Sequence, residues 1–155
     1  MDIFFGTGWD GILYPAGNGK EKIMIVFSGS EGGLEHAGKC CRYLQDNGID
    51  SFALGYYKTK HASKKLDRIP VEIFDEVIKN LKGMGYRRIG VEGVSKGAEL
   101  ALAAAIRYFR GKDSRTDSHV FNEGRCDLAV DGELRKDLRA PGGKSVFLSL
   151  QAYCL

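Results

Sequence analysis

The chain has 155 residues, of which 43% are hydrophobic and 28% are charged, so it can form one domain with a buried core and is not disordered throughout. Its 23 basic and 20 acidic side chains are interleaved and give a net charge of +3, which argues against nucleic acid as the main partner. No stretch reaches the roughly 18 apolar residues of a membrane-spanning helix, and residues 1–6 do not resemble a secretory signal. The sequence therefore predicts a cytoplasmic domain with no membrane partner.

The cysteines also favour a reduced, cytoplasmic protein. They show no C-x-x-C spacing, so neither a disulfide framework nor a metal site is expected, and no cofactor is predicted. Two of them are adjacent in a predicted helix and are interpreted as small core-filling residues rather than redox partners. The four are Cys40, Cys41, Cys126 and Cys154.

The first third of the chain alternates between strand and helix patterns. Residues 11–15 predict a short strand that a proline ends, and the branched apolar run at residues 23–27 predicts a strand buried on both faces, as in a parallel sheet. A glycine-rich loop follows at residues 28–33. Residues 34–47 then show a helical period, and Gly48 stands at the C′ position that glycine favours.

The same alternation continues to about residue 107. Residues 49–57 predict a strand, residues 58–68 form a polar crossing, and residues 70–81 predict a helix with a proline in its first turn. Residues 88–94 predict a third buried strand, and residues 98–108 an alanine-rich helix. We therefore predict an α/β fold with a mostly parallel sheet and flanking helices.

The sharpest chemical motif is the G-x-S-x-G sequence of residues 93–97, which joins a predicted buried strand directly to a predicted helix. This context is typical of a nucleophile elbow, in which a strained turn presents the serine above the sheet edge. The flanking glycines would let strand and helix pass closely. We interpret Ser95 as the catalytic nucleophile; the alternative is a tight turn in which Ser95 caps the helix.

A nucleophilic serine of this kind needs hydrogen-bond donors for the oxyanion that forms during acyl transfer. The backbone N–H of Lys96 would be one donor, and the N–H of Ser30 or Glu31 in the glycine-rich loop would be the other. The alternative is an ordinary strand-to-helix loop.

Four segments carry a likeness to a known family: F-S-G-S-E-G-G-L at residues 27–34, A-L-G-Y-Y at 53–57, K-K-L-D-R-I-P-V-E-I-F at 64–74 and G-V-S-K-G-A-E-L-A at 93–101. They resemble a group of α/β-hydrolases, the C-terminal catalytic domain of acyl-CoA thioesterases and bile acid-CoA:amino acid N-acyltransferases. The resemblance implies an α/β-hydrolase fold and a serine or cysteine that attacks an acyl thioester, after which water or an amine takes the acyl group. A serine at the nucleophile position favours hydrolysis of a small acyl thioester or ester.

The rest of a hydrolase triad is not identifiable. An acid and then a histidine should follow the serine in chain order. The histidine that follows Ser95 is His119, a weak candidate base, and no histidine follows any of the candidate acids. Those acids are Asp127, Asp131 and Asp137.

The C-terminal stretch departs from the pattern of the rest. Residues 126–130 and 145–153 could each be a strand, but most of residues 108–155 shows neither period. We predict a single domain over residues 1–155, with a well-patterned core at 1–107 and an atypical tail in which the C-terminal part of the fold is truncated or replaced. An exposed sheet edge would then allow a homodimer.

The predicted function is acyl-CoA thioester hydrolysis by a serine nucleophile, weak or absent in this chain because a serine without a base attacks poorly. One alternative is a non-catalytic or fragmentary domain of the same fold, and another is a carboxylesterase or an enzyme similar to dienelactone hydrolase. Binding of CoA phosphates by Lys39 and Lys96 is not favoured, since scattered surface lysines are usually only solvated.

Overall fold

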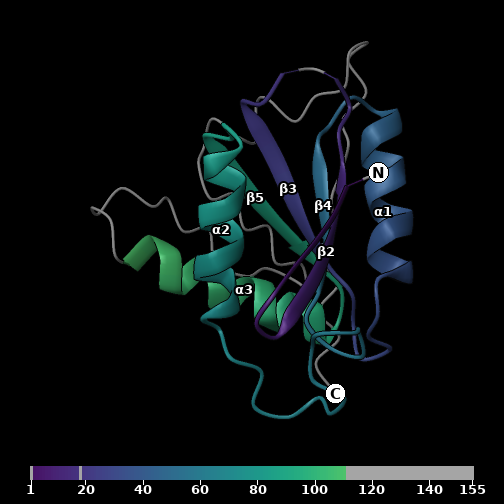
Figure 1. Ribbon diagram of the computed structural model, residues 1–155, viewed down its shortest axis with the longest axis vertical. Helices are drawn as coiled ribbons and strands as arrows, with labels where there is room; N and C mark the ends of the chain where they lie inside the picture. Colours follow the sequence, from purple (N-terminus) through teal and green to yellow (C-terminus); the bar gives the residue numbers. More distant parts are fainter. Residues whose placement is uncertain (1, 18, 111–155) are drawn as a thin grey trace, which may run out of the picture.

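The computed structural model describes residues 2–17 and 19–110, which form an α/β structure with helices on both faces of one sheet (Figure 1). The strands are β1 (Asp2–Gly6), β2 (Trp9–Tyr14), β3 (Lys22–Phe27), β4 (Ser51–Gly55) and β5 (Arg88–Gly93). The helices are α1 (Glu35–Asp46), α2 (Ile73–Gly83) and α3 (Lys96–Arg110).

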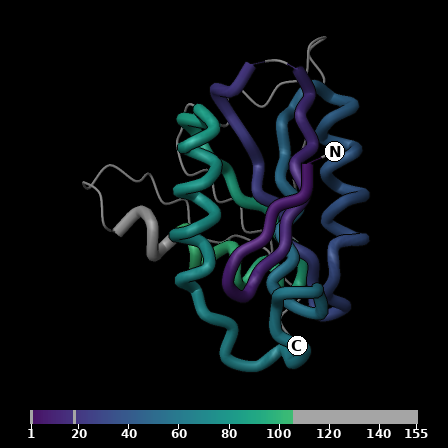
Figure 2. Tube along the Cα trace, viewed as in Figure 1, coloured from purple at the N-terminus to yellow at the C-terminus, as the bar shows by residue number. Residues whose placement is uncertain are grey.

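The sheet is mixed, which corrects the prediction of a mostly parallel sheet. Its order is β1-β2-β4-β3-β5; β4, β3 and β5 run parallel, whereas β2 is antiparallel to both β1 and β4. Strand β1 was not predicted because its apolar run, Ile3 to Phe5, is only three residues long. At the edge of the sheet this strand leaves Ile3 70% and Phe5 65% exposed. A hairpin joins it to β2, as the purple trace in Figure 2 shows.

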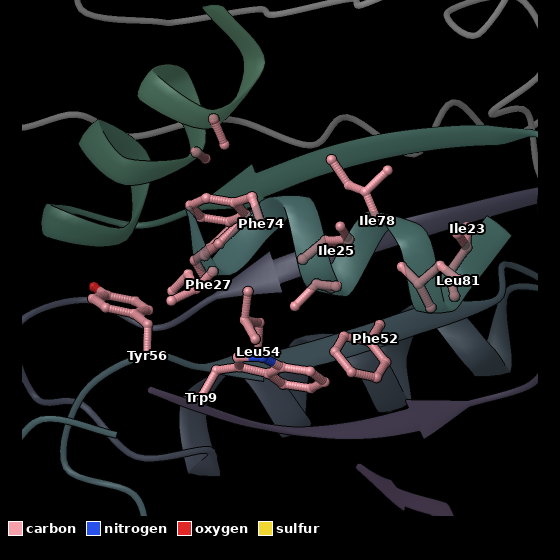
Figure 3. Packing of buried hydrophobic residues seen from close by; sticks show 14 of the residues in the cluster. Trp9, Ile23, Ile25, Phe27, Phe52, Leu54, Tyr56, Phe74, Ile78 and Leu81 are labelled. Atoms are coloured by element: carbon pink, nitrogen blue, oxygen red, sulfur yellow. The ribbon is translucent and has the colours of Figure 1, made fainter. Parts of the chain in front are cut away.

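Two apolar clusters hold the helices to the sheet. On one face α1 packs through Ala37, Cys41 and Leu44. On the other face α2 and α3 cover a larger cluster, in which the rings of Phe27 and Phe74 lie 5.0 Å apart between their centroids (Figure 3). The central position of β3 explains its continuous apolar run, because both of its faces are covered.

The predicted elements are present with shifted boundaries: β2 begins at Trp9 rather than residue 11, and β4 is confined to Ser51–Gly55 within the predicted 49–57. Helix α1 ends as predicted, with Gly48 in the left-handed region at φ +77°. Helix α2 begins at Ile73, because Pro70 and Val71 first form a separate turn whose carbonyls accept the N–H groups of Ile73 and Phe74. Helix α3 begins at Lys96, two residues before the predicted start.

Residues 111–155 lie outside the described part of the chain, and with them the predicted strands at 126–130 and 145–153 and most of the predicted tail. None of the helices in the described ranges has the length and apolar content that crossing a bilayer requires.

Candidate functional site

Ser95 occupies a strained turn between β5 and α3. Its φ of +53° lies in the left-handed region, which non-glycine residues rarely adopt. The turn is closed by hydrogen bonds from Gly97 N–H to the Val94 carbonyl and from Ala98 N–H to the Ser95 carbonyl, each 2.9 Å long. A serine that caps a helix normally has extended backbone, so this conformation is closer to a nucleophile elbow than to a simple cap.

The two glycines of the motif are required by close backbone contacts. A Cβ atom on Gly93 would lie 2.4 Å from the carbonyl oxygen of Gly97. A Cβ on Gly97 would lie 2.3 Å from the carbonyl oxygen of Ser28, at the end of β3. Because backbone atoms cannot move aside as a side chain can, only glycine lets β3, β5 and α3 meet this closely.

The loop after β3, residues 28–33, lies directly against Ser95. A Cβ on Gly29 would be 3.1 Å from the Val94 carbonyl oxygen and 3.4 Å from the Cβ of Ser95. The buried Ser28 fixes the base of the loop, since its hydroxyl accepts the Ala37 N–H at 3.3 Å and its carbonyl accepts the Tyr56 hydroxyl at 2.8 Å. The two segments that the sequence analysis chose for acyl transfer are therefore neighbours.

The predicted oxyanion donors lie at this junction. The Lys96 N–H belongs to the first turn of α3, whose amide donors have no acceptor within the helix. Ser30 and Glu31 are exposed at the tip of the neighbouring loop. The Lys96 side chain pairs with Glu99 at 2.8 Å, whereas the predicted oxyanion role concerns the backbone N–H of Lys96.

Acidic side chains flank the candidate site. The Glu31 carboxylate folds back and accepts the Gly29 N–H at 2.8 Å. Burial, together with the nearby charges of Glu31 and Glu99, raises the pKa of Tyr56 to about 12. Negative charge beside Ser95 opposes the development of an oxyanion there.

The described histidines have partners other than Ser95. His36 is exposed on α1, with Nε2 3.8 Å from the Cys40 sulfur. His61 lies in the loop after β4, with Nδ1 2.5 Å from Oδ1 of Asp10, while its ring stacks on Phe5. The predicted base and acids lie outside the described residues: His119, Asp127, Asp131 and Asp137.

Sequence reasoning missed the Asp10–His61 pair because 51 positions separate its members. Asp10 is buried in β2 and also accepts the backbone N–H of His61 at 2.8 Å. Burial raises the pKa of Asp10, but hydrogen bonds from Thr59 and His61 outweigh this effect and hold it below its usual value. The sequence did contain one signal: Asp10 lies among apolar residues, and a carboxylate buried in such a strand needs a hydrogen-bonding partner.

Cysteine and metal chemistry find no support in the described residues. Cys41 is fully buried in the α1 cluster, as predicted, and burial raises the pKa of its thiol to about 12. Burial also raises the pKa of the half-buried Cys40. In residues 2–17 and 19–110, no group of three or more histidine, cysteine or acidic side chains could hold a metal ion.

Glu92 on β5 is a second unusual carboxyl group. Its Oε2 atom is buried and has no hydrogen-bond partner within the described chain. Burial raises the pKa of Glu92 to about 7. In the parallel register Glu92 lies opposite Val26, which packs on the α1 face of the sheet, so Glu92 is separate from the turn at Ser95.

Comparison with known proteins gives a partial similarity. No family model matches the chain. Over 101 residues it is 35% identical to acyl-coenzyme A thioesterase 5 from Mus musculus. Part of this chain thus resembles an acyl-coenzyme A thioesterase. The match covers 61% of this chain and 23% of the thioesterase, so the chain spans about a quarter of the length of that relative.

Proposed function

We propose that this chain carries the nucleophile and oxyanion segments of an acyl-thioester hydrolase with an α/β-hydrolase fold. The observation that carries the proposal is the left-handed backbone of Ser95, held between two obligatory glycines against the loop after β3. Strain of this kind persists where the surrounding structure enforces it, and it is frequent at active sites. The partial similarity to an acyl-coenzyme A thioesterase supports a thioester as the substrate.

In the proposed reaction the Ser95 oxygen bonds to the acyl carbon, and the thioester carbonyl oxygen becomes an oxyanion. The N–H groups of Lys96 and of Ser30 or Glu31 stabilise it. Its collapse breaks the carbon–sulfur bond and releases the thiol, which takes up the proton that Ser95 lost. Water then attacks the acyl-serine, releases the carboxylic acid and restores the hydroxyl.

Transfer of the Ser95 proton requires a base, and the contacts of His36 and His61 do not assign either to this role. His119 remains a prediction from the sequence. We therefore expect slow turnover by residues 1–155 alone, because an oxyanion site without a base retains only residual catalysis.

A fluorophosphonate probe tests the proposal on the full chain. We expect it to label wild-type protein at Ser95 and to leave Ser95→Ala unlabelled, with residual hydrolysis of an acyl thioester lost in the same variant. Thr7→Ala, which removes a hydroxyl from the exposed β1–β2 turn, is the matched control and should behave as wild type. Equal labelling or hydrolysis by wild type and Ser95→Ala would favour the non-catalytic alternative.

A further inference from the structure

We propose that residues 58–68, here called the basic loop, bind the phosphate groups of the coenzyme A part of the thioester; this inference rests on the proposed function. The loop carries five exposed cations against one carboxylate, Asp67. Its net charge of +4 exceeds the +3 of the whole chain, so the excess positive charge is concentrated here. The cations are Lys58, Lys60, Lys64, Lys65 and Arg68.

The basic loop follows β4 and lies at the sheet edge that holds Ser95. Strands β3, β4 and β5 are parallel, and Phe27 pairs with Leu54 on one side and Gly93 on the other, so all three end at one edge. Figure 1 shows the teal loop between β4 and α2 at the end of the sheet where β5 leads into α3. The basic loop and the candidate site therefore share one edge of the sheet.

A continuous series of contacts joins Ser95 to the basic loop. Gly29, in the loop after β3, lies against Ser95. In the same loop, a Cβ atom on Gly32 would lie 3.0 Å from the Cβ of Lys58, the first residue of the basic loop. The Gly33 N–H also donates to the Tyr57 carbonyl at 2.8 Å. Two strand spacings, roughly 10 Å, separate β5 from β4. Coenzyme A suits this arrangement, because its pantetheine arm separates the thioester from the phosphates.

Internal contacts hold the basic loop in shape before any ligand binds. The buried Asp10 accepts two hydrogen bonds from His61, and Lys58 N–H donates to the Ser63 carbonyl at 2.8 Å. Lys58 and Arg68 both have left-handed backbone, at φ +53° and +47°. A loop that is already ordered loses less conformational entropy on binding a ligand.

Lysine and arginine bind phosphate through charge-assisted hydrogen bonds, and here five cations share one acid. Outside the loop, Lys39 pairs with Glu35 and Lys96 pairs with Glu99, so the two lysines considered from the sequence each have a carboxylate partner. Because a phosphate would have to compete with these carboxylates, the basic loop is a better candidate than Lys39 or Lys96 for binding the coenzyme A phosphates.

The test measures calorimetric binding of coenzyme A and of pantetheine, which lacks the phosphates, to the full chain carrying Ser95→Ala. We expect coenzyme A to bind more tightly, and the double change Lys64→Glu and Lys65→Glu to weaken its binding by about tenfold or more without changing pantetheine binding. The control, Lys20→Glu with Lys79→Glu, reverses two exposed charges outside the loop and should change neither affinity by more than about twofold. Unchanged coenzyme A binding in the loop variant would overturn the inference.

Two further arms separate the alternatives. ATP supplies phosphates without a pantetheine arm, and binding of ATP as tight as that of coenzyme A would overturn the assignment to coenzyme A. Hydrolysis of an acyl-pantetheine by the chain with native Ser95 tests the nucleophile independently of the basic loop. Its absence, with charge-dependent coenzyme A binding retained, would contradict only the proposed function.

Discussion

Gly97 of α3 lies against the end of β3 so closely that a methyl group on it would stand 2.3 Å from the carbonyl oxygen of Ser28. This contact joins the turn that holds Ser95 to the loop that supplies the predicted second oxyanion donor. The spacing of the motif is thus a packing requirement as well as a chemical one.

Gly97→Ala should therefore lower the free energy of unfolding by about 3 kcal/mol or more, since the new methyl group meets backbone atoms that cannot move aside. Gly83→Ala is the matched control, because a Cβ there meets nothing within 4 Å at the end of α2. It should leave stability unchanged or raise it by up to about 1 kcal/mol. Urea denaturation followed by circular dichroism measures both, and equal stabilities would contradict the close approach.

Glu31→Gln should increase residual thioester hydrolysis by roughly 3-fold to 10-fold, because it removes a negative charge from beside the developing oxyanion. The amide oxygen can still accept the Gly29 N–H that the carboxylate accepts at 2.8 Å. Glu72→Gln, just before α2, removes the same charge outside the loop that contacts Ser95 and should leave the rate unchanged. Steady-state kcat/KM distinguishes the two variants, and a lower rate in Glu31→Gln would show that the carboxylate assists the reaction.

Local patterns predicted the features that depend on neighbouring residues. The apolar run of β3 and the glycine spacing around Ser95 reflect close packing within short segments, so the sequence displays them directly. Strand β1 was missed because its apolar run, Ile3 to Phe5, is too short to stand out. The pairing of Asp10 with His61 depends on two strands and a loop coming together, which no local period records.

Asp10→Asn should loosen the basic loop and lower the free energy of unfolding by about 1–3 kcal/mol, because a buried hydrogen-bonded charge is lost. The pKa of Asp10 is held below its usual value of 3.8, so its contribution is present above pH 4 and is lost as the pH falls through the lowered pKa. Trypsin should cut the variant faster after the lysines of the basic loop.

Asp67→Asn is the control for that experiment. It changes an exposed carboxylate in the same loop, paired with Arg68 at 3.1 Å, and should alter stability by less than about 0.5 kcal/mol. If Asp10→Asn were cleaved no faster than Asp67→Asn, the Asp10–His61 pair would not be what orders the loop.

Glu92→Gln should change how stability depends on pH. Burial raises the pKa of Glu92 from 4.5 to about 7, so folding favours its protonated form. The stability that this group contributes is complete below pH 4.5 and is lost as the pH rises through 7. At pH 8 the charged form costs at most about 3 kcal/mol, and glutamine avoids that cost.

Thermal unfolding should show Glu92→Gln gaining stability over wild type between pH 5 and pH 8. Glu35→Gln, on the exposed surface of α1, is the control and should not show this gain. Parallel pH profiles for wild type and Glu92→Gln would mean that the Glu92 carboxyl group is solvated in the folded chain.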